Sequence, residues 1–236
     1  MLYNEEAVRA NIRNREGKRI FYLGKGDQLT SAARDYLSRE RIEIRPGEQA
    51  KQDCFSLLTG GFLTEKPEHM THLNGDFLVV KDHPRIIFRG KLDTLESELI
   101  LCQLTDKGLE APVGEILELA RRIIRCEVLD EGGEPLQWDR LCGLTEDEQR
   151  KRSHFPQDYY GQPHFMPSAA DGAAIARLNR ARCAAREAEL AAVTAFRDRE
   201  GNPTRVDILR AMNRMSSMLY LLMIQKRADA GRGKER

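Results

Sequence analysis

Hydrophobic and polar positions follow a helical period over most of the second half of the chain. The first periodic run comprises Phe88, Leu92, Leu95, Leu99 and Cys102. Pro84 suits the first turn of this helix, and Asp82 stands where it can cap it. Similar patterns predict helices at about 113–128, 169–197 and 204–227. Several helices with little strand are typical of a helical bundle, so we expect a mainly α fold.

Between the second and third predicted helices, the pattern breaks down. Residues 143–167 read GLTEDEQRKRSHFPQDYYGQPHFMP and are rich in proline and aromatic side chains. No sustained period runs through this segment. We therefore expect an irregular stretch here, with Phe155, Tyr159, Tyr160 and Phe165 packed as a loop cluster.

The N-terminal residues have a different pattern. KRIFYL at 18–23 and IEIR at 42–45 are typical of short strands. Between them lies LTSAARDYLSRE, a helical segment that Thr30 can cap. Residues 1–50 are therefore predicted to form a small β-α-β appendage with little core of its own.

The remaining boundaries follow from composition. Residues 51–65 contain Gly60 and Gly61 and no period, which favours a linker or loop. The helical domain is then expected at 66–230. The basic tail at 227–236, RADAGRGKER, is predicted to be disordered.

The third predicted helix carries two informative stripes. Small side chains suited to close packing form the first: Ala174, Leu178, Ala181, Ala185, Ala188 and Ala192. On the adjoining stripe lie Arg182, Arg186 and Glu189. Glu189 can pair with Arg186, whereas Arg182 has no local acidic partner. By spacing alone we favour a solvated face with one Arg–Glu pair, and the alternative is a grip on a polyphosphate.

The fourth predicted helix is apolar on two sides. One stripe comprises Ile208, Met212, Met215, Leu219 and Met223, and the other comprises Leu209, Asn213, Ser216 and Tyr220. A buried amide without a partner costs about 1–3 kcal/mol, so Asn213 is predicted to bond another helix or to contact a ligand. Together with the small-residue stripe, these apolar faces exceed what one thin bundle needs, which favours assembly of several chains.

Composition narrows the function classes. The 236 residues include 38 Lys and Arg against 37 Asp and Glu, so no overall field attracts nucleic acid or an anionic membrane. The longest apolar run, MLYLLMI at 218–224, is far shorter than the roughly 20 residues of a membrane span, and the acidic N-terminus is not typical of a signal peptide. We expect neither nucleic acid nor membrane as a partner.

Cysteine and histidine usage gives no metal or redox motif. Five cysteines occur, without a CxxC pair: Cys54, Cys102, Cys126, Cys142 and Cys183. Their odd number and scattered positions fit reduced thiols in a cytoplasmic protein. His69 and His72 are three residues apart, but no further ligands complete a set, so no metal site is predicted. His154 and His164 could serve as acid or base, although no nucleophile accompanies them.

Several segments together resemble a known enzyme family. In order they are THLNGDFLVVKDHPRIIFRGKLDTLE at 71–96, HFMP at 164–167, the Arg182-x-x-x-Arg186-x-x-Glu189 spacing and LRAMNRMSS at 209–217. This order and spacing resemble the ATP:corrinoid adenosyltransferases. KPEHMTHL at 66–73 and GLTEDEQRKRSHFPQDYY at 143–160 are similar to segments of the ethanolamine-utilization branch. The resemblance covers most of the chain.

The resemblance implies a fold and a reaction. Members form a bundle of about five helices that assembles as a trimer, with each active site between subunits. They transfer the 5′-deoxyadenosyl group of ATP, with Mg²⁺, to the Co(I) form of cobalamin and release triphosphate. A flavoprotein reductase and a bacterial microcompartment shell are the implied partners.

The resemblance also implies roles for residues that bind ATP. Thr71 and Gly75 match a loop that folds over the nucleotide, and Lys81 matches a lysine that reaches the phosphates. Arg182 and Arg186 match residues that hold the triphosphate with its magnesium. A flexible ammonium and forked guanidinium groups are chemically suited to phosphate oxygens.

Further matches complete the implied site. Glu189 would orient an arginine or the ribose, and Asn213 would lie near the nucleotide or the subunit interface. Asp93 matches an aspartate that pairs with an arginine across the subunit boundary, most simply Arg182. Phe165 matches the aromatic residue at the lower face of the corrinoid, although its spacing to Arg182 is one residue longer than in propanediol-type relatives.

One departure from the branch concerns metal. Ethanolamine-type members often carry a histidine and a Cys-Cys-x-x-Cys cluster upstream of the KPxxxTHL segment, and these bind a divalent metal. Here the equivalent region has only Cys54. One cysteine and two histidines at this spacing do not make a thiolate site, so no transition metal is predicted.

Two alternatives remain open at this point. One is a non-catalytic corrinoid-binding or delivery protein that keeps the fold. The other is a helical scaffold that docks to a microcompartment through residues 1–50. The retained Lys81, Arg182 and Arg186 favour the enzyme over both.

Overall fold

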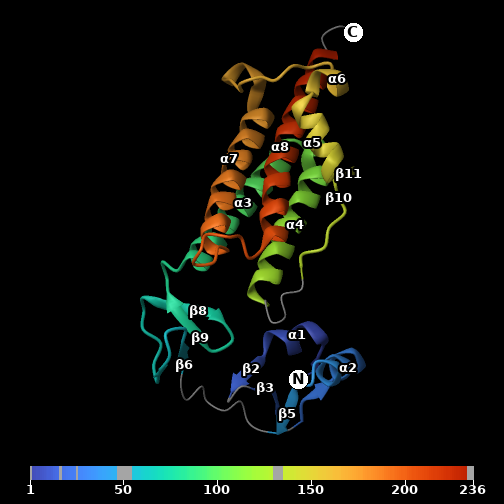
Figure 1. Ribbon diagram of the computed structural model, residues 1–236. Coiled ribbons are helices and arrows are strands. Elements are labelled where there is room, and N and C mark those ends of the chain that lie inside the picture. Colours follow the sequence, from blue (N-terminus) through green and yellow to red (C-terminus); the bar gives the residue numbers. More distant parts are fainter. Residues whose placement is uncertain (1, 16–17, 25, 47–54, 130–134, 233–236) are drawn as a thin grey trace. The chain divides into compact units, whose positions relative to one another are not determined.

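Two units make up the chain in the computed structural model (Figure 1), which describes all residues except 1, 16–17, 25, 47–54, 130–134 and 233–236. The first unit contains residues 1–83 with the segment 128–131. The second contains residues 84–127 and 132–236. The helical unit therefore begins at Pro84, later than the expected boundary at residue 66.

The first unit begins with a small α/β layer. Its elements are β1 (Leu2–Tyr3), α1 (Glu5–Ala10), β2 (Ile12–Arg15), β3 (Lys18–Leu23), β4 (Gln28–Leu29), α2 (Ser31–Arg39) and β5 (Glu43–Pro46). β3 and β5 run parallel with α2 between them in the chain, which gives the predicted β-α-β arrangement. The cap is also as predicted, since the Thr30 hydroxyl accepts the Ala33 N–H at 3.2 Å.

This layer has more core than the sequence led us to expect. A cluster of buried side chains fills it: Tyr3, Val8, Ile12, Phe21, Leu29, Ala33, Tyr36, Leu37 and Ile42. Several of these come from β1, α1 and β2, which the hydrophobic pattern did not reveal. Elements of two to six residues are too short to show a period, and their apolar residues become a core only after strand pairing.

A second sheet completes the first unit. It has the order β7-β6-β9-β8, from β6 (Phe55–Leu57), β7 (Phe62–Leu63), β8 (Met70–Asn74) and β9 (Phe77–Val80). The stretch 51–65, expected as a linker, thus contains two strands, while residues 51–54 lie outside the described part. β6 pairs with β9, about 20 residues later in the chain, so no local sequence pattern predicts this strand.

The second unit is mainly helical, as predicted. Its elements are α3 (Pro84–Thr105), η1 (Lys107–Leu109), α4 (Glu110–Val128), β10 (Arg140–Leu141), β11 (Leu144–Thr145), α5 (Glu146–His154), α6 (Pro156–Tyr160), η2 (Ala169–Asp171), α7 (Gly172–Ala195) and α8 (Val206–Arg232). The four predicted helices correspond to α3, α4, α7 and α8. α7 and α8 lie side by side, and α5 runs along α8 (Figure 1).

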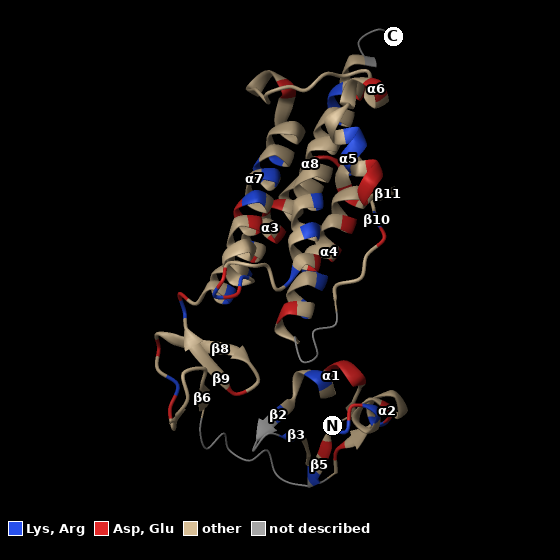
Figure 2. Cartoon of the chain, viewed as in Figure 1, with Lys and Arg blue, Asp and Glu red and all other residues tan. Residues whose placement is uncertain are grey.

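The segment expected to be irregular contains α5 and α6. Thr145 and Glu148 form a capping box at the start of α5. Figure 2 shows acidic residues at the start of α5 and basic residues in its later turns, an arrangement that favours the helix dipole. Capping and charge specify this helix, because its sequence has almost no apolar face.

Both apolar stripes predicted for α7 and α8 are buried within one chain. Leu178, Ala181, Ala185, Ala188 and Ala192 are all fully buried, as are Ile208, Met212, Met215, Leu219 and Met223. Close packing of α7 on its neighbours is therefore confirmed. These side chains are already covered within one chain, so they do not themselves require a second chain, whereas the second stripe of α8 (Leu209, Asn213, Ser216 and Tyr220) is only half-buried.

The C-terminal segment is also more ordered than expected. α8 continues through Arg232, so most of the predicted tail at 227–236 is helical. The last residues, 233–236, lie outside the described part. None of the helices in the described part of the chain is sufficiently long and apolar to span a bilayer.

Candidate functional site

The carboxylate of Glu189 on α7 is held by α8. Asn213 Nδ2 donates to Glu189 Oε1 at 2.9 Å, so the interhelical hydrogen bond predicted for Asn213 is present. Glu189 forms no ion pair with Arg186 among the described residues, and the local Arg–Glu pairing considered from the spacing does not occur. Arg186 is exposed, and its guanidinium has no acidic partner within the described ranges.

Arg182 lies one turn before Arg186 and is half-buried. Its Nε is 3.4 Å from Asn179 Oδ1, a weak hydrogen bond, and its guanidinium carbon is 5.7 Å from the centre of the Tyr220 ring. This contact is of the cation–π type. The structure therefore places Arg182 against α8, at a tyrosine that sequence reasoning did not select.

The same tyrosine holds Phe165. The two rings are stacked with centroids 6.2 Å apart, and the Phe165 N–H donates to the Tyr220 hydroxyl at 3.2 Å. Arg227 lies over the Phe165 ring at 4.4 Å and is 3.6 Å from Asp171. The structure thus brings Phe165 and Arg182 together on Tyr220.

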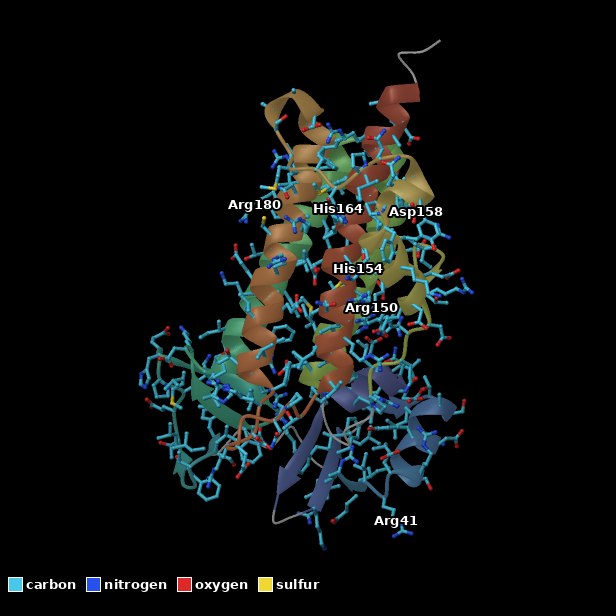
Figure 3. The ribbon with its side chains drawn as sticks, turned by 45° about the horizontal axis from the view of Figure 1, so that its top comes forward. Arg41, Arg150, His154, Asp158, His164 and Arg180 are labelled. Atoms are coloured by element: carbon cyan, nitrogen blue, oxygen red, sulfur yellow. The ribbon has the colours of Figure 1, made fainter. Side chains whose placement is uncertain are left out.

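His164 joins this group from the same segment. Its ring stacks on Tyr220 at 5.8 Å, and Nδ1 is 3.1 Å from the tyrosine hydroxyl. Figure 3 shows His164 beside α8 and Arg180 at the edge of α7 that faces away from α8. Arg180 is paired there with Glu98 at 3.2 Å, which makes it a useful comparison for Arg182 and Arg186.

Arg214 is a second residue that sequence reasoning missed. It donates to Asn213 Oδ1, while its Nε and Nη1 are buried without a hydrogen-bond partner in the described part of the chain. Burial lowers the pKa of Arg214, and the carboxylate of Glu146 acts in the opposite direction. An incompletely satisfied guanidinium beside Asn213 adds positive charge next to Glu189. Its only sequence signal is its place directly after Asn213.

Thr71, Gly75 and Lys81 belong to the hairpin of β8 and β9 in the first unit. Thr71 is in β8 opposite Val79, and Gly75 occupies the turn with φ of +50°. Lys81 follows β9, with its N–H bonded to the His69 carbonyl at 2.9 Å. Its ammonium is exposed and 3.9 Å from Glu68, at the limit of an ion pair. Backbone pairing fixes the position of this lysine while its side chain stays extended into solvent.

Asp93 lies on the exposed side of α3. Its carbonyl accepts the Ser97 hydroxyl at 2.9 Å. No ion pair or hydrogen bond of its carboxylate is found within the described residues. Asp93 is therefore available to a group from outside the chain.

Metal-binding side chains do not gather in the described part of the chain, where no group of three His, Cys, Asp or Glu residues is found. His72 lies in β8 with Nδ1 at 3.1 Å from the Gly75 carbonyl. Cys54 lies outside the described residues. Burial raises the pKa of Cys102 to about 11 and that of Cys142 to about 12, so both thiols stay protonated.

Comparison with known proteins covers most of these residues. Residues 62–226 match the model of the family described as cobalamin adenosyltransferase. The corrinoid adenosyltransferase EutT of Salmonella typhimurium strain LT2 is 32% identical over 244 residues, covering 93% of this chain and 90% of that protein. EutT of Escherichia coli strain K12 is 29% identical over 245 residues with the same coverage. No solved structure shows significant similarity to the chain.

Proposed function

Because this chain belongs to the cobalamin adenosyltransferase family, we propose that it transfers the 5′-deoxyadenosyl group of ATP to the Co(I) form of cobalamin. Co(I) donates an electron pair to the C5′ atom, so that a Co–C bond forms. The C5′–O bond breaks, and triphosphate leaves with the electrons of that bond. The corrinoid supplies the nucleophile, and the protein needs to supply only binding, orientation and charge.

The observation that carries this proposal is the meeting of Phe165 and Arg182 on Tyr220. The aromatic ring of Phe165 is suited to the lower face of a corrinoid. Forked guanidinium groups of Arg182 and Arg186 are suited to a leaving triphosphate, whose negative charge they stabilise in the transition state. The side chains that we propose for the two substrates therefore contact the same tyrosine.

Glu189 and Asn213 would complete the nucleotide side. Their mutual hydrogen bond fixes the Glu189 carboxylate on the face of α7 that carries both arginines. From there it can orient an arginine or accept a hydrogen bond from the ribose. Asn213 thereby acts as a support for the nucleotide site as well as a link between helices.

Thr71, Gly75 and Lys81 would close over the nucleotide. Lys81 makes only a long contact with a fully exposed glutamate, which holds the lysine weakly. The ammonium can leave this contact at little cost and reach phosphate oxygens. The positive φ of Gly75 supports a tight turn whose backbone amides approach a ligand closely.

Mg²⁺ would accompany the triphosphate. This ion is usually held by one or two carboxylates together with substrate phosphates. Glu189 is the carboxylate that shares a helix face with Arg182 and Arg186. No resident transition metal is part of the proposal.

We further propose a homotrimer in which Asp93 of one subunit meets Arg182 of its neighbour. The carboxylate of Asp93 is exposed and without a partner in the described part of the chain. Large apolar side chains are exposed on α3 and α7: Ile100, Leu104, Leu190 and Val193. These, and not the buried stripes of α7 and α8, are the surface that a neighbouring subunit would cover.

The cellular setting follows from the relatives. The name EutT and the segments shared with the ethanolamine-utilization branch favour a role in ethanolamine utilization, in the cytoplasm at a bacterial microcompartment. A flavoprotein reductase would supply the electron that converts Co(II) to Co(I). Residues 1–50, with a core of their own, are the proposed contact with the shell.

The visible spectrum of cob(II)alamin tests the proposal. With protein and ATP, we expect the four-coordinate form, followed by adenosylcobalamin once a reductant is added. The four-coordinate form without any product would indicate a delivery protein, and an unchanged spectrum would indicate a scaffold. Arg186→Ala should abolish the ATP-dependent change, whereas Arg180→Ala, which alters an exposed arginine on the same helix, should preserve it.

A further inference from the structure

Tyr220 contacts three side chains from two distant segments of the chain. Its ring lies 5.8 Å from that of His164, 6.2 Å from that of Phe165 and 5.7 Å from the guanidinium carbon of Arg182. Nothing in the sequence pattern of α8 distinguishes this tyrosine from other residues of its half-buried stripe. It lies between Phe165, proposed to meet the corrinoid, and Arg182, proposed to meet the triphosphate, so it contacts both sides of the proposed site.

The hydroxyl of Tyr220 both donates and accepts a hydrogen bond. The His154 carbonyl can only accept, so His164 Nε2, at 3.2 Å from it, carries the ring proton. In the neutral imidazole, Nδ1 is then an acceptor, and the Tyr220 hydroxyl donates to it at 3.1 Å. The hydroxyl oxygen accepts the Phe165 N–H at 3.2 Å. One oxygen thus ties the backbone at Phe165 and the ring of His164 to α8.

The ring of Tyr220 has a separate task. Arg182 contacts it through the guanidinium, and this attraction depends on the aromatic ring and not on the hydroxyl. Among the described residues, Arg182 has only a weak hydrogen bond to Asn179 in addition. The ring therefore limits where the Arg182 guanidinium can lie, and it also stacks on the Phe165 ring. The hydroxyl adds the bond that holds the backbone N–H of Phe165.

We propose that Tyr220 is a positioning residue that sets the Phe165 ring and the Arg182 guanidinium at a fixed separation. This inference rests on the proposed function, because it assumes that Phe165 meets the corrinoid and Arg182 the triphosphate. In-line attack requires the two substrates to be held in register, so an anchor common to both sides contributes to turnover and not only to binding.

The two tasks can be separated by substitution. Tyr220→Phe keeps the ring and removes the hydroxyl, so the corrinoid side should loosen while Arg182 stays in place. ATP affinity should remain within about twofold of wild type, and the maximal turnover should fall about fivefold to tenfold, the factor that one hydrogen bond provides. Tyr220→Leu removes both tasks and should weaken ATP binding as well.

Amide hydrogen exchange at Phe165 provides a readout that needs neither substrate. In Tyr220→Phe the Phe165 amide should exchange about fivefold faster than in wild type, because its acceptor is gone. Tyr159→Phe is the matched control: it removes a hydroxyl from an exposed tyrosine of α6 and should change neither exchange nor turnover. Unchanged exchange at Phe165 in Tyr220→Phe would overturn the proposal.

Substrate assays complete the test. ATP binding by calorimetry, turnover, and the ATP-dependent spectrum of cob(II)alamin should be measured for wild type and the three variants. The proposal predicts loss of turnover and of the four-coordinate signal in Tyr220→Phe with ATP affinity retained. Equal loss of ATP affinity in Tyr220→Phe and Tyr220→Leu would overturn it. A wild-type protein without turnover would instead refute the proposed function, and the exchange measurement would still decide whether Tyr220 holds Phe165.

Discussion

Replacing Glu127 by glutamine removes a negative charge from the interior of the helical unit. Glu127 lies in the last turn of α4 and is fully buried, and its two carboxylate oxygens accept hydrogen bonds from Arg85 and Arg89 of α3. The Arg89 Nε lies 2.5 Å from Glu127 Oε2, and Arg85 also donates to the Glu127 carbonyl at 2.7 Å. The carboxylate therefore joins the first two turns of α3 to the end of α4.

The size of the effect follows from burial. Breaking a buried ion pair from one side costs about 3–5 kcal/mol, because the remaining charges keep their desolvation penalty. The side chains of Arg85 and Arg89 retain 18% and 17% exposure, so water can still reach them and the lower end applies. We expect Glu127→Gln to lower the free energy of unfolding by about 3 kcal/mol. For a domain of this size, that corresponds to a melting temperature about 6–12 °C lower.

Thermal and urea denaturation followed by far-ultraviolet circular dichroism measure this change. Glu118→Gln is the matched control on the same helix, since Glu118 and Arg125 form an exposed pair with a 2.5 Å contact. Exposed pairs contribute at most about 1 kcal/mol, so the control should unfold nearly as the wild type does. If the two variants lost the same stability, the reasoning from burial would be refuted.

Three further predictions concern the proposed site. Arg186→Ala and Lys81→Ala should reduce ATP binding or turnover at least tenfold while leaving the melting temperature nearly unchanged. Arg180→Ala, which breaks ion pairs with Glu98 and Glu187, should leave ATP binding and turnover unchanged. A parallel loss of stability and activity in Arg186→Ala or Lys81→Ala would favour a structural role. Asp93→Ala should impair both assembly and ATP use, and adding Arg182→Ala should cost little more, because both changes break the same proposed pair; light scattering that found a fully active monomer would exclude the shared site. Adenosylation should persist with Mg²⁺ after treatment with a transition-metal chelator, and stoichiometric zinc or iron by elemental analysis would contradict this.

Some of the fold could be predicted because its signals are local. Apolar residues at steps of three and four place the four long helices within a few residues of α3, α4, α7 and α8. α5 escaped this reasoning because its sequence, EDEQRKRSH, is polar on all sides. Its capping box at Thr145 and Glu148 was the available signal. β6 and β7 escaped because strands of two or three residues gain their stability from partners elsewhere.

The sequence by itself determined the family and the helical stripes, and it supplied the charged residues that we propose to meet a triphosphate. It also determined that Asn213, set in an apolar helix, needs a partner. Only the tertiary structure decided that this partner is Glu189, the carboxylate three residues after Arg186 that the spacing had offered to that arginine. Likewise, only the packing of α7, α8 and the segment before η2 brings Arg182 and Phe165 to Tyr220. The physical reason is that periodicity fixes which face of a helix is buried, whereas side-chain partners depend on which distant element covers that face.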